Sequence, residues 1–132
     1  MTRYWIICLL FIALGSCNGK ENVEALGAAC LKQAREALMR GDCGEAFRAV
    51  DSLRKNFPMA LNAREAGIVL KDSIEIESAK RRLWIIKQEA KRMERIGKEL
   101  DSLREEHDDA LQRIKFYRHK LKHDLANMKL HK

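Results

Sequence analysis

Apolar residues recur every three or four positions along residues 23–40 and 43–56, which predicts two short amphipathic helices. Gly41 and Asp42 separate them, because glycine suits the left-handed residue after a helix and aspartate suits the cap of the next one. Pro58 ends the second helix and suits the first turn of a third. The expected buried positions are Leu26, Cys30, Ala34, Ala37 and Leu38 in the first helix, and Ala46, Phe47, Val50 and Leu53 in the second.

A longer apolar pattern runs from Ala79 onward, with spacings that alternate between three and four residues. This is the heptad pattern of a coiled coil. If the helix is unbroken from Pro58 to about Leu130, it is roughly 110 Å long at 1.5 Å per residue. The predicted seam consists of Leu83, Ile86, Ala90, Met93, Ile96, Leu100, Leu103, His107, Ala110, Ile114, Tyr117 and Leu121.

Two interruptions leave the continuity of this helix open. The seam spacing shortens next to Gly97, which is one place for a bend. A reversal near His107 and Asp108 is the other option, because polar and acidic residues interrupt the seam there. The two short helices can cover only the first turns, so the remaining seam needs a partner: a second copy, another helical protein, or the chain folded back on itself.

The composition agrees with a helical protein. The chain has one proline in 132 residues and is rich in Ala, Leu, Lys, Arg and Glu. Residues of high strand propensity are scarce and never alternate with polar residues over a strand's length. The sequence therefore predicts an all-α fold, with two short helices followed by a long, coiled-coil-like helix.

The first segment has the features of a secretion signal. Nine apolar residues, Ile6–Leu14, follow a short start with one positive charge at Arg3. This run is too short to cross a bilayer as a helix, which takes about 20 residues. It ends in Leu14-Gly15-Ser16-Cys17, which resembles the lipobox of bacterial lipoproteins. The resemblance implies cleavage after residue 16 and lipidation of Cys17, and more than one acyl chain would anchor the protein stably.

The same resemblance implies an address in the bacterial cell envelope. Asn18 stands where some bacteria use aspartate to retain lipoproteins at the inner membrane, which favours the outer membrane. Cys17 carries lipid in this interpretation, and Cys8 leaves with the signal. The remaining pair, Cys30 and Cys43, is about 15 Å apart along a hairpin at 1.5 Å per residue, so we expect no disulfide between them.

The short helices resemble a tetratricopeptide repeat. The stretch ALMRGDCGEAFRAVDSLRKNFP has that family's turn, its small residue at Ala46 and its closing Pro58, and LNAREAGIVLKDSI resembles the first helix of a second repeat. The resemblance covers residues 24–76. The family's signature Trp and Tyr are absent, since Cys30 and Ala37 occupy their places, and one and a half repeats are fewer than stable arrays contain.

Charge is distributed unevenly along the chain. Residues 17–77 have a net charge of −1, whereas residues 78–132 have +7. A basic, partly aromatic tail after Leu111 is a candidate for binding an anionic envelope polymer such as peptidoglycan. The final Lys132 is similar to the lysine that links murein lipoprotein to peptidoglycan. The candidate anion-binding residues are Arg113, Lys115, Arg118, Lys120 and Lys122.

The sequence contains no pattern of a catalytic site, a cofactor site or a metal site, so we expect no enzyme, and an envelope address argues against nucleic acid as a partner. The expected organisation is a signal peptide over 1–16, a tether over 17–22, the repeat-like helices over 23–76 and a long basic helix over 77–132. The whole resembles small bacterial lipoproteins that join a repeat-like hairpin to a coiled coil. The primary hypothesis is an anchored interaction or scaffold protein, and the alternative is a tether to an anionic polymer.

Overall fold

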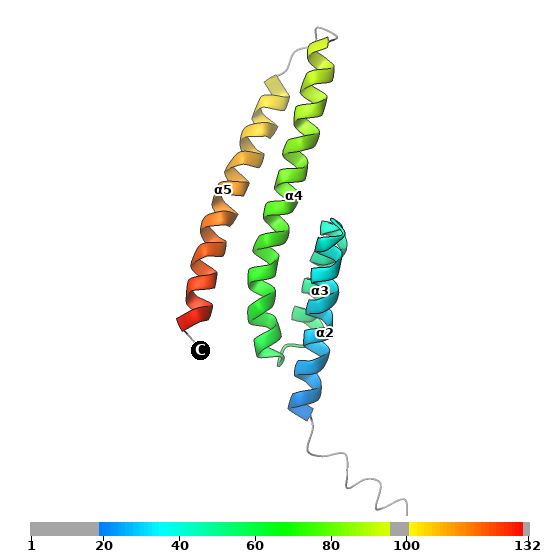
Figure 1. The fold of residues 1–132 in the computed structure, drawn as a ribbon, viewed down its shortest axis with the longest axis vertical. Coiled ribbons are helices and arrows are strands. Elements are labelled where there is room, and N and C mark those ends of the chain that lie inside the picture. The colour runs from blue at the N-terminus through cyan, green and yellow to red at the C-terminus, as the bar shows by residue number, and fades with distance from the viewer. Residues whose placement is uncertain (1–18, 96–100, 131–132) are drawn as a thin grey trace, which may run out of the picture.

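The structure is a computed structural model that describes residues 19–95 and 101–130 (Figure 1). These residues form four α-helices and no strand, which confirms the all-α prediction. The helices are α2 (Gly19–Met39), α3 (Cys43–Asn56), α4 (Leu61–Arg95) and α5 (Asp101–Leu130). Helix α4 is central: α2 and α3 pack against its first half, and α5 runs antiparallel along another side.

The turn between α2 and α3 follows from its residues. Gly41 has a φ angle of 79°, in the left-handed region that glycine adopts without strain. The N–H groups of Gly41 and Asp42 donate to the carbonyl oxygens of Leu38 and Ala37, each at 2.9 Å, which is the hydrogen-bond pattern of a Schellman motif. Asp42 then caps α3, because its carboxylate accepts from the Glu45 N–H at 2.8 Å. The predicted turn and cap are confirmed.

The start of α4 is capped by a residue from another helix. Glu24, in α2, accepts a hydrogen bond from the Ala63 N–H at 2.7 Å. The first N–H groups of a helix lack partners within it and carry partial positive charge, so a carboxylate stabilises them. A contact between residues 39 positions apart therefore fixes where α2 lies against α4.

The core lies where α2, α3 and α4 meet. Leu53 is fully buried there and extends between two glycines. A Cβ atom at Gly27 would lie 3.2 Å from Leu53 Cδ1, and one at Gly67 would lie 3.1 Å from Leu53 Cδ2. Small residues thus let three helices approach one leucine closely. The other buried residues of this core are Leu31, Ala34, Ala37, Ala46, Ala49, Val50, Ala60, Ala63, Leu70 and Ile74.

Gly27 offers a test of this close approach. A Cβ atom at position 27 would lie 2.5 Å from the Cβ of Ala60, a contact that only a backbone shift can relieve. We expect Gly27→Val to lower the free energy of unfolding by about 2–3 kcal/mol, the cost of overpacking a core. Urea denaturation followed by circular dichroism measures it. Ala28→Val is the matched control, since Ala28 is exposed. Equal losses in both variants would contradict this packing.

The prediction of one long helix over 77–132 is wrong. The chain reverses between Arg95 and Asp101, so the second half of the seam folds back onto the first. The proposed reversal near Asp108 is also wrong, because Asp108 lies inside α5. The physical reason is that folding back covers the apolar seam within one chain, without the entropic cost of recruiting a partner. The described seam positions are buried or half-buried: Leu83, Ile86, Ala90, Met93, Leu103, His107, Ala110, Ile114, Tyr117 and Leu121.

Other expectations need smaller corrections. Helix α2 begins at Gly19, so residues 19–22 belong to a helix and not to the tether predicted over 17–22. Glu21 in the first turn favours this earlier start, because it complements the positive end of the helix. Leu26 and Phe47, expected in the core, are exposed. Residues 1–18, including Cys17, residues 96–100, including Gly97, and residues 131–132, including Lys132, lie outside the described residues.

None of the helices in residues 19–95 and 101–130 combines the length and the apolar composition needed to cross a bilayer.

Candidate functional site

Two of the five candidate anion-binding residues pair with carboxylates of α4. Arg113 lies 3.0 Å from Glu75, and Lys120 lies 2.8 and 3.0 Å from the two carboxylate oxygens of Asp72. These contacts join α5 to α4 along their antiparallel interface. A third pair, Arg82 with Glu106 at 3.3 Å, lies further along the same interface. Arg113 and Lys120 therefore stabilise the position of α5, and their charges are largely neutralised.

The Lys120 ammonium also donates to Asp124 at 2.7 Å, so it lies between two carboxylates. Asp72 is 1% exposed, and burial raises its pKa, which the hydrogen bond from Lys120 offsets only in part. Partial burial would lower the pKa of Lys120, but its hydrogen bonds to Asp124 and Asp72 raise it overall. The same hydrogen bond from Lys120 lowers the pKa of Asp124. The buried carboxylate of Asp72 thus has the cationic partner that a buried charge requires.

The remaining three candidates share an outer face of α5. Lys115, Arg118 and Lys122 are three and four residues apart, so they lie on one side of the helix, and all are exposed. His119 and Lys129 extend this face in the same register. The structure thus separates the five residues into two that join α5 to α4 and three that face solvent. Anion binding by the outer face stays a prediction.

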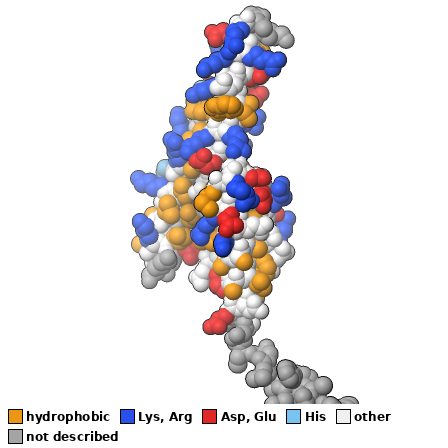
Figure 2. Space-filling view, turned by 45° about the vertical axis from the view of Figure 1, so that its right-hand side comes forward, with side chains coloured by type: hydrophobic (Ala, Val, Ile, Leu, Met, Phe, Trp, Pro, Cys, Tyr) orange, Lys and Arg blue, Asp and Glu red, His pale blue; other side chains and the backbone are white. Residues whose placement is uncertain are grey.

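A hollow of about 500 Å³ lies beside the turn between α2 and α3. It is bordered by Leu38 and Cys43 on one side and by Trp84 and Ile85 of α4 on the other. Trp84 is 63% exposed at this edge of the hollow. From this level upward α4 and α5 extend beyond α2 and α3, and basic side chains gather on this projecting part (Figures 1 and 2).

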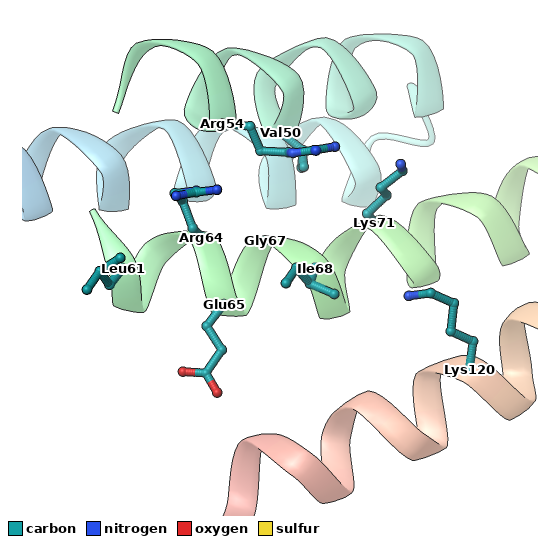
Figure 3. A pocket seen from close by; sticks show the side chains of 9 residues that line it. All are labelled: Val50, Arg54, Leu61, Arg64, Glu65, Gly67, Ile68, Lys71 and Lys120. Atoms are coloured by element: carbon teal, nitrogen blue, oxygen red, sulfur yellow. The ribbon is translucent and has the colours of Figure 1, made fainter. Parts of the chain in front are cut away.

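A second cavity, of about 450 Å³, lies over the first half of α4, between α3 and α5 (Figure 3). Arg54, Arg64 and Lys71 lie toward its α3 side, and Lys120 approaches from α5. The apolar residues on its wall are Val50, Leu61 and Ile68. No local sequence pattern marks this cavity, because its cations come from three helices and each one resembles an ordinary solvated charge.

Cys30 and Cys43 are both free and half-buried. Within the described residues, no three His, Cys, Asp or Glu side chains come together as metal ligands would.

The chain matches no protein-family model, and it shows no significant similarity to a curated protein or to a solved structure.

Proposed function

We propose that this protein is a lipid-anchored lipoprotein of the bacterial cell envelope, placed in the outer membrane, and that it acts as a non-enzymatic interaction or scaffold protein. The sequence Leu14-Gly15-Ser16-Cys17 supports the anchor. Helix α2 begins at Gly19, two residues after Cys17, so lipid on this cysteine would hold the helical body close to the membrane. The anchor supplies a location, and the helices supply the surfaces that a partner contacts.

The observation that carries the interaction role is the exposed face of α4 beyond the short helices. Trp84 and Ile85 are more than half exposed there, next to the hollow at the α2–α3 turn. Tryptophan is typical of the residues that anchor a protein partner, and Ile85 adds apolar surface beside it. The coiled-coil seam no longer serves this purpose, because α5 covers it. We therefore place the partner-binding surface at Trp84 and Ile85, outside the seam.

The anchor is tested by intact mass and membrane fractionation of the protein produced in a bacterium. We expect the natural chain to lose residues 1–16, to gain the mass of acyl chains and to sediment with membranes. Cys17→Ala should do none of these, whereas Cys8→Ala should behave like the natural chain, since Cys8 leaves with the signal. If Cys17→Ala is processed and fractionates normally, the lipoprotein proposal is wrong.

The outer face of α5 favours a second candidate function, a tether to peptidoglycan or another anionic envelope polymer. Lys115, Arg118 and Lys122 are exposed together and lack carboxylate partners within the described residues. Changing all three to Gln should abolish a salt-sensitive sedimentation with purified peptidoglycan. The matched control changes three exposed cations of α2 and α3, Lys32, Arg35 and Arg48. Equal sedimentation of both variants and the natural chain would exclude this function for the α5 face.

A further inference from the structure

The cavity over the first half of α4 has more positive charge than its surroundings neutralise. Lys120 is held by Asp72 and Asp124, but Arg54 and Lys71 form no ion pair within the described residues. Glu65 is the one acidic side chain on the wall, and it points away from the three cations on the α3 side (Figure 3). Cations brought together in this way repel each other unless an anion joins them.

The nearest acidic residue on α3, Asp51, offsets part of this charge from a distance, but it forms an ion pair with neither Arg54 nor Lys71. Asp51 pairs with Lys55 at 2.7 Å, on the exposed side of the helix. That hydrogen bond is the main reason why the pKa of Asp51 is lowered, and the charges of Arg54 and Lys71 lower it further. Lys71 also lies over the ring of Phe47, with its nitrogen 5.3 Å from the ring centre, which helps to fix its position.

Arg64 provides a separate sign that an acceptor is missing. Its Nη1 donates to the carbonyl oxygen of Pro58 at 2.7 Å. Its Nε is buried and has no hydrogen-bond partner among the described residues. A buried donor without an acceptor costs about 1–3 kcal/mol, so it is rarely kept without a reason. This nitrogen is closed off from the cavity as the side chain lies, so it would reach an anion there only if the Arg64 guanidinium, which borders the cavity, turned.

The parts of the cavity wall between the cations are apolar. Ile68 is 50% exposed. Leu61, seven residues or about two turns earlier on the same face of α4, is 65% exposed. Val50 adds a third aliphatic side chain. The volume, about 450 Å³, lies in the range of sites for small organic ligands. An inorganic ion alone would leave this apolar surface in contact with water.

We propose that the cavity between α3, α4 and α5 binds an amphiphilic phosphate monoester. The phosphate contacts Arg54, Arg64 and Lys71, and the apolar body covers Ile68, Leu61 and Val50. Arginine suits this ligand, because its planar guanidinium donates two hydrogen bonds to phosphate oxygens at once. Such a ligand has two sources, a free alkyl phosphate or phosphatidic acid, a phospholipid whose headgroup is a phosphate monoester. Binding of this ligand does not require lipidation of Cys17.

Isothermal titration of the full-length protein at low salt tests the site with three probes. Hexyl phosphate has both parts of the ligand, inorganic phosphate has only the charge, and 1-hexanol has only the chain. We expect hexyl phosphate to bind about tenfold more tightly than either of the others. Monomeric dihexanoyl phosphatidic acid is then titrated against the hexyl phosphate complex. Displacement assigns the site to a lipid headgroup, and no displacement assigns it to a free ester.

Variants locate the binding. Arg54→Gln combined with Lys71→Gln should weaken hexyl phosphate about tenfold or more. The matched control, Arg35→Gln with Arg48→Gln, removes two exposed cations of α2 and α3 outside the cavity and should change nothing. Ile68→Asn should weaken hexyl phosphate but not inorganic phosphate. All these positions lie at the surface or the cavity edge, so circular dichroism should show unchanged folding. Equal affinity for the three probes, or full binding by the Arg54/Lys71 variant, overturns the proposal.

Discussion

Replacing Lys120 with methionine is expected to lower the free energy of unfolding by about 2–3 kcal/mol at neutral pH. The change leaves Asp72, which is 1% exposed, as a buried charge with no partner from α5. Losing one member of a buried pair costs about 3–5 kcal/mol, and we expect less because the Lys120 side chain is 38% exposed. Urea denaturation at pH 7, followed by circular dichroism, measures the loss.

The loss should shrink as the pH falls. Burial already raises the pKa of Asp72 above its ordinary value of 3.8, and removing the Lys120 ammonium raises it further. A carboxyl whose pKa is raised on folding destabilises the fold only once it is charged, so this cost disappears as the pH falls through that raised pKa. The Lys120 hydrogen bond also lowers the pKa of Asp124 in the natural chain, and this contribution, which the variant lacks, is fully present only above the ordinary pKa of 3.8. The gap between Lys120→Met and the natural chain should therefore be smaller at pH 4 than at pH 7.

Two controls separate the buried pair from a general effect of charge. Lys122→Met removes an exposed cation of α5 two positions after Lys120, on a different side of the helix, and should change stability by less than about 0.5 kcal/mol. Combining Lys120→Met with Asp72→Leu removes both members of the pair and should recover most of the loss. If Lys120→Met and Lys122→Met behave alike at both pH values, the network contributes nothing to the fold.

Replacing Leu53 with alanine is the other change with a large expected effect. Leu53 is fully buried between α2, α3 and α4, so its truncation removes transfer free energy and leaves a cavity. We expect a loss of about 3 kcal/mol in the free energy of unfolding, within the range for buried Leu→Ala changes. Leu61→Ala, at an exposed leucine of α4, is the matched control and should cost less than about 0.5 kcal/mol.

The two glycines around Leu53 make this prediction more specific. A Cβ atom at Gly67 would lie 3.1 Å from Leu53 Cδ2 and 3.9 Å from Val50 Cγ1. With Leu53 truncated, the tight contact disappears, and Gly67→Ala should stabilise the protein by about 1 kcal/mol through helix propensity. In the natural chain, where Leu53 is present, Gly67→Ala should stabilise the protein by less than about 1 kcal/mol. A double-mutant cycle measures the difference, and simple additivity would contradict the packing described here.

The sequence predicts which segments are helical and which positions form the seam. It does not predict which helix covers the seam. Residues 43–56 were predicted as a helix and form α3, because a glycine, an aspartate and a proline mark its ends. The heptad spacing correctly identified positions such as Ile86, Ala110 and Ile114 as buried. However, the spacing is the same whether the seam meets a second copy or its own continuation. Only the three-dimensional arrangement distinguishes the two, and here α5 supplies the cover.

The candidate site was less predictable. Five basic residues of α5 looked equivalent in the sequence, since each lies on a charged stretch. Their roles differ because Asp72 and Glu75 of α4 face two of them across the antiparallel interface, and this facing depends on where the chain reverses. The cavity cations Arg54 and Lys71 are 17 positions apart and come from different helices, so no local motif marks them.

The pairing of helices also determines how the protein opens. In the described residues α5 contacts α4 alone, whereas α2, α3 and α4 all contact one another. Helix α5 can therefore separate from α4 while the core around Leu53 stays intact. Amide hydrogens of α5 should exchange with solvent through this partial opening, at a lower free energy than those of α3, which require global unfolding. The protein thus behaves as two cooperative units of unequal stability. Helices α2, α3 and α4 form the more stable unit, and α5 is the less stable one.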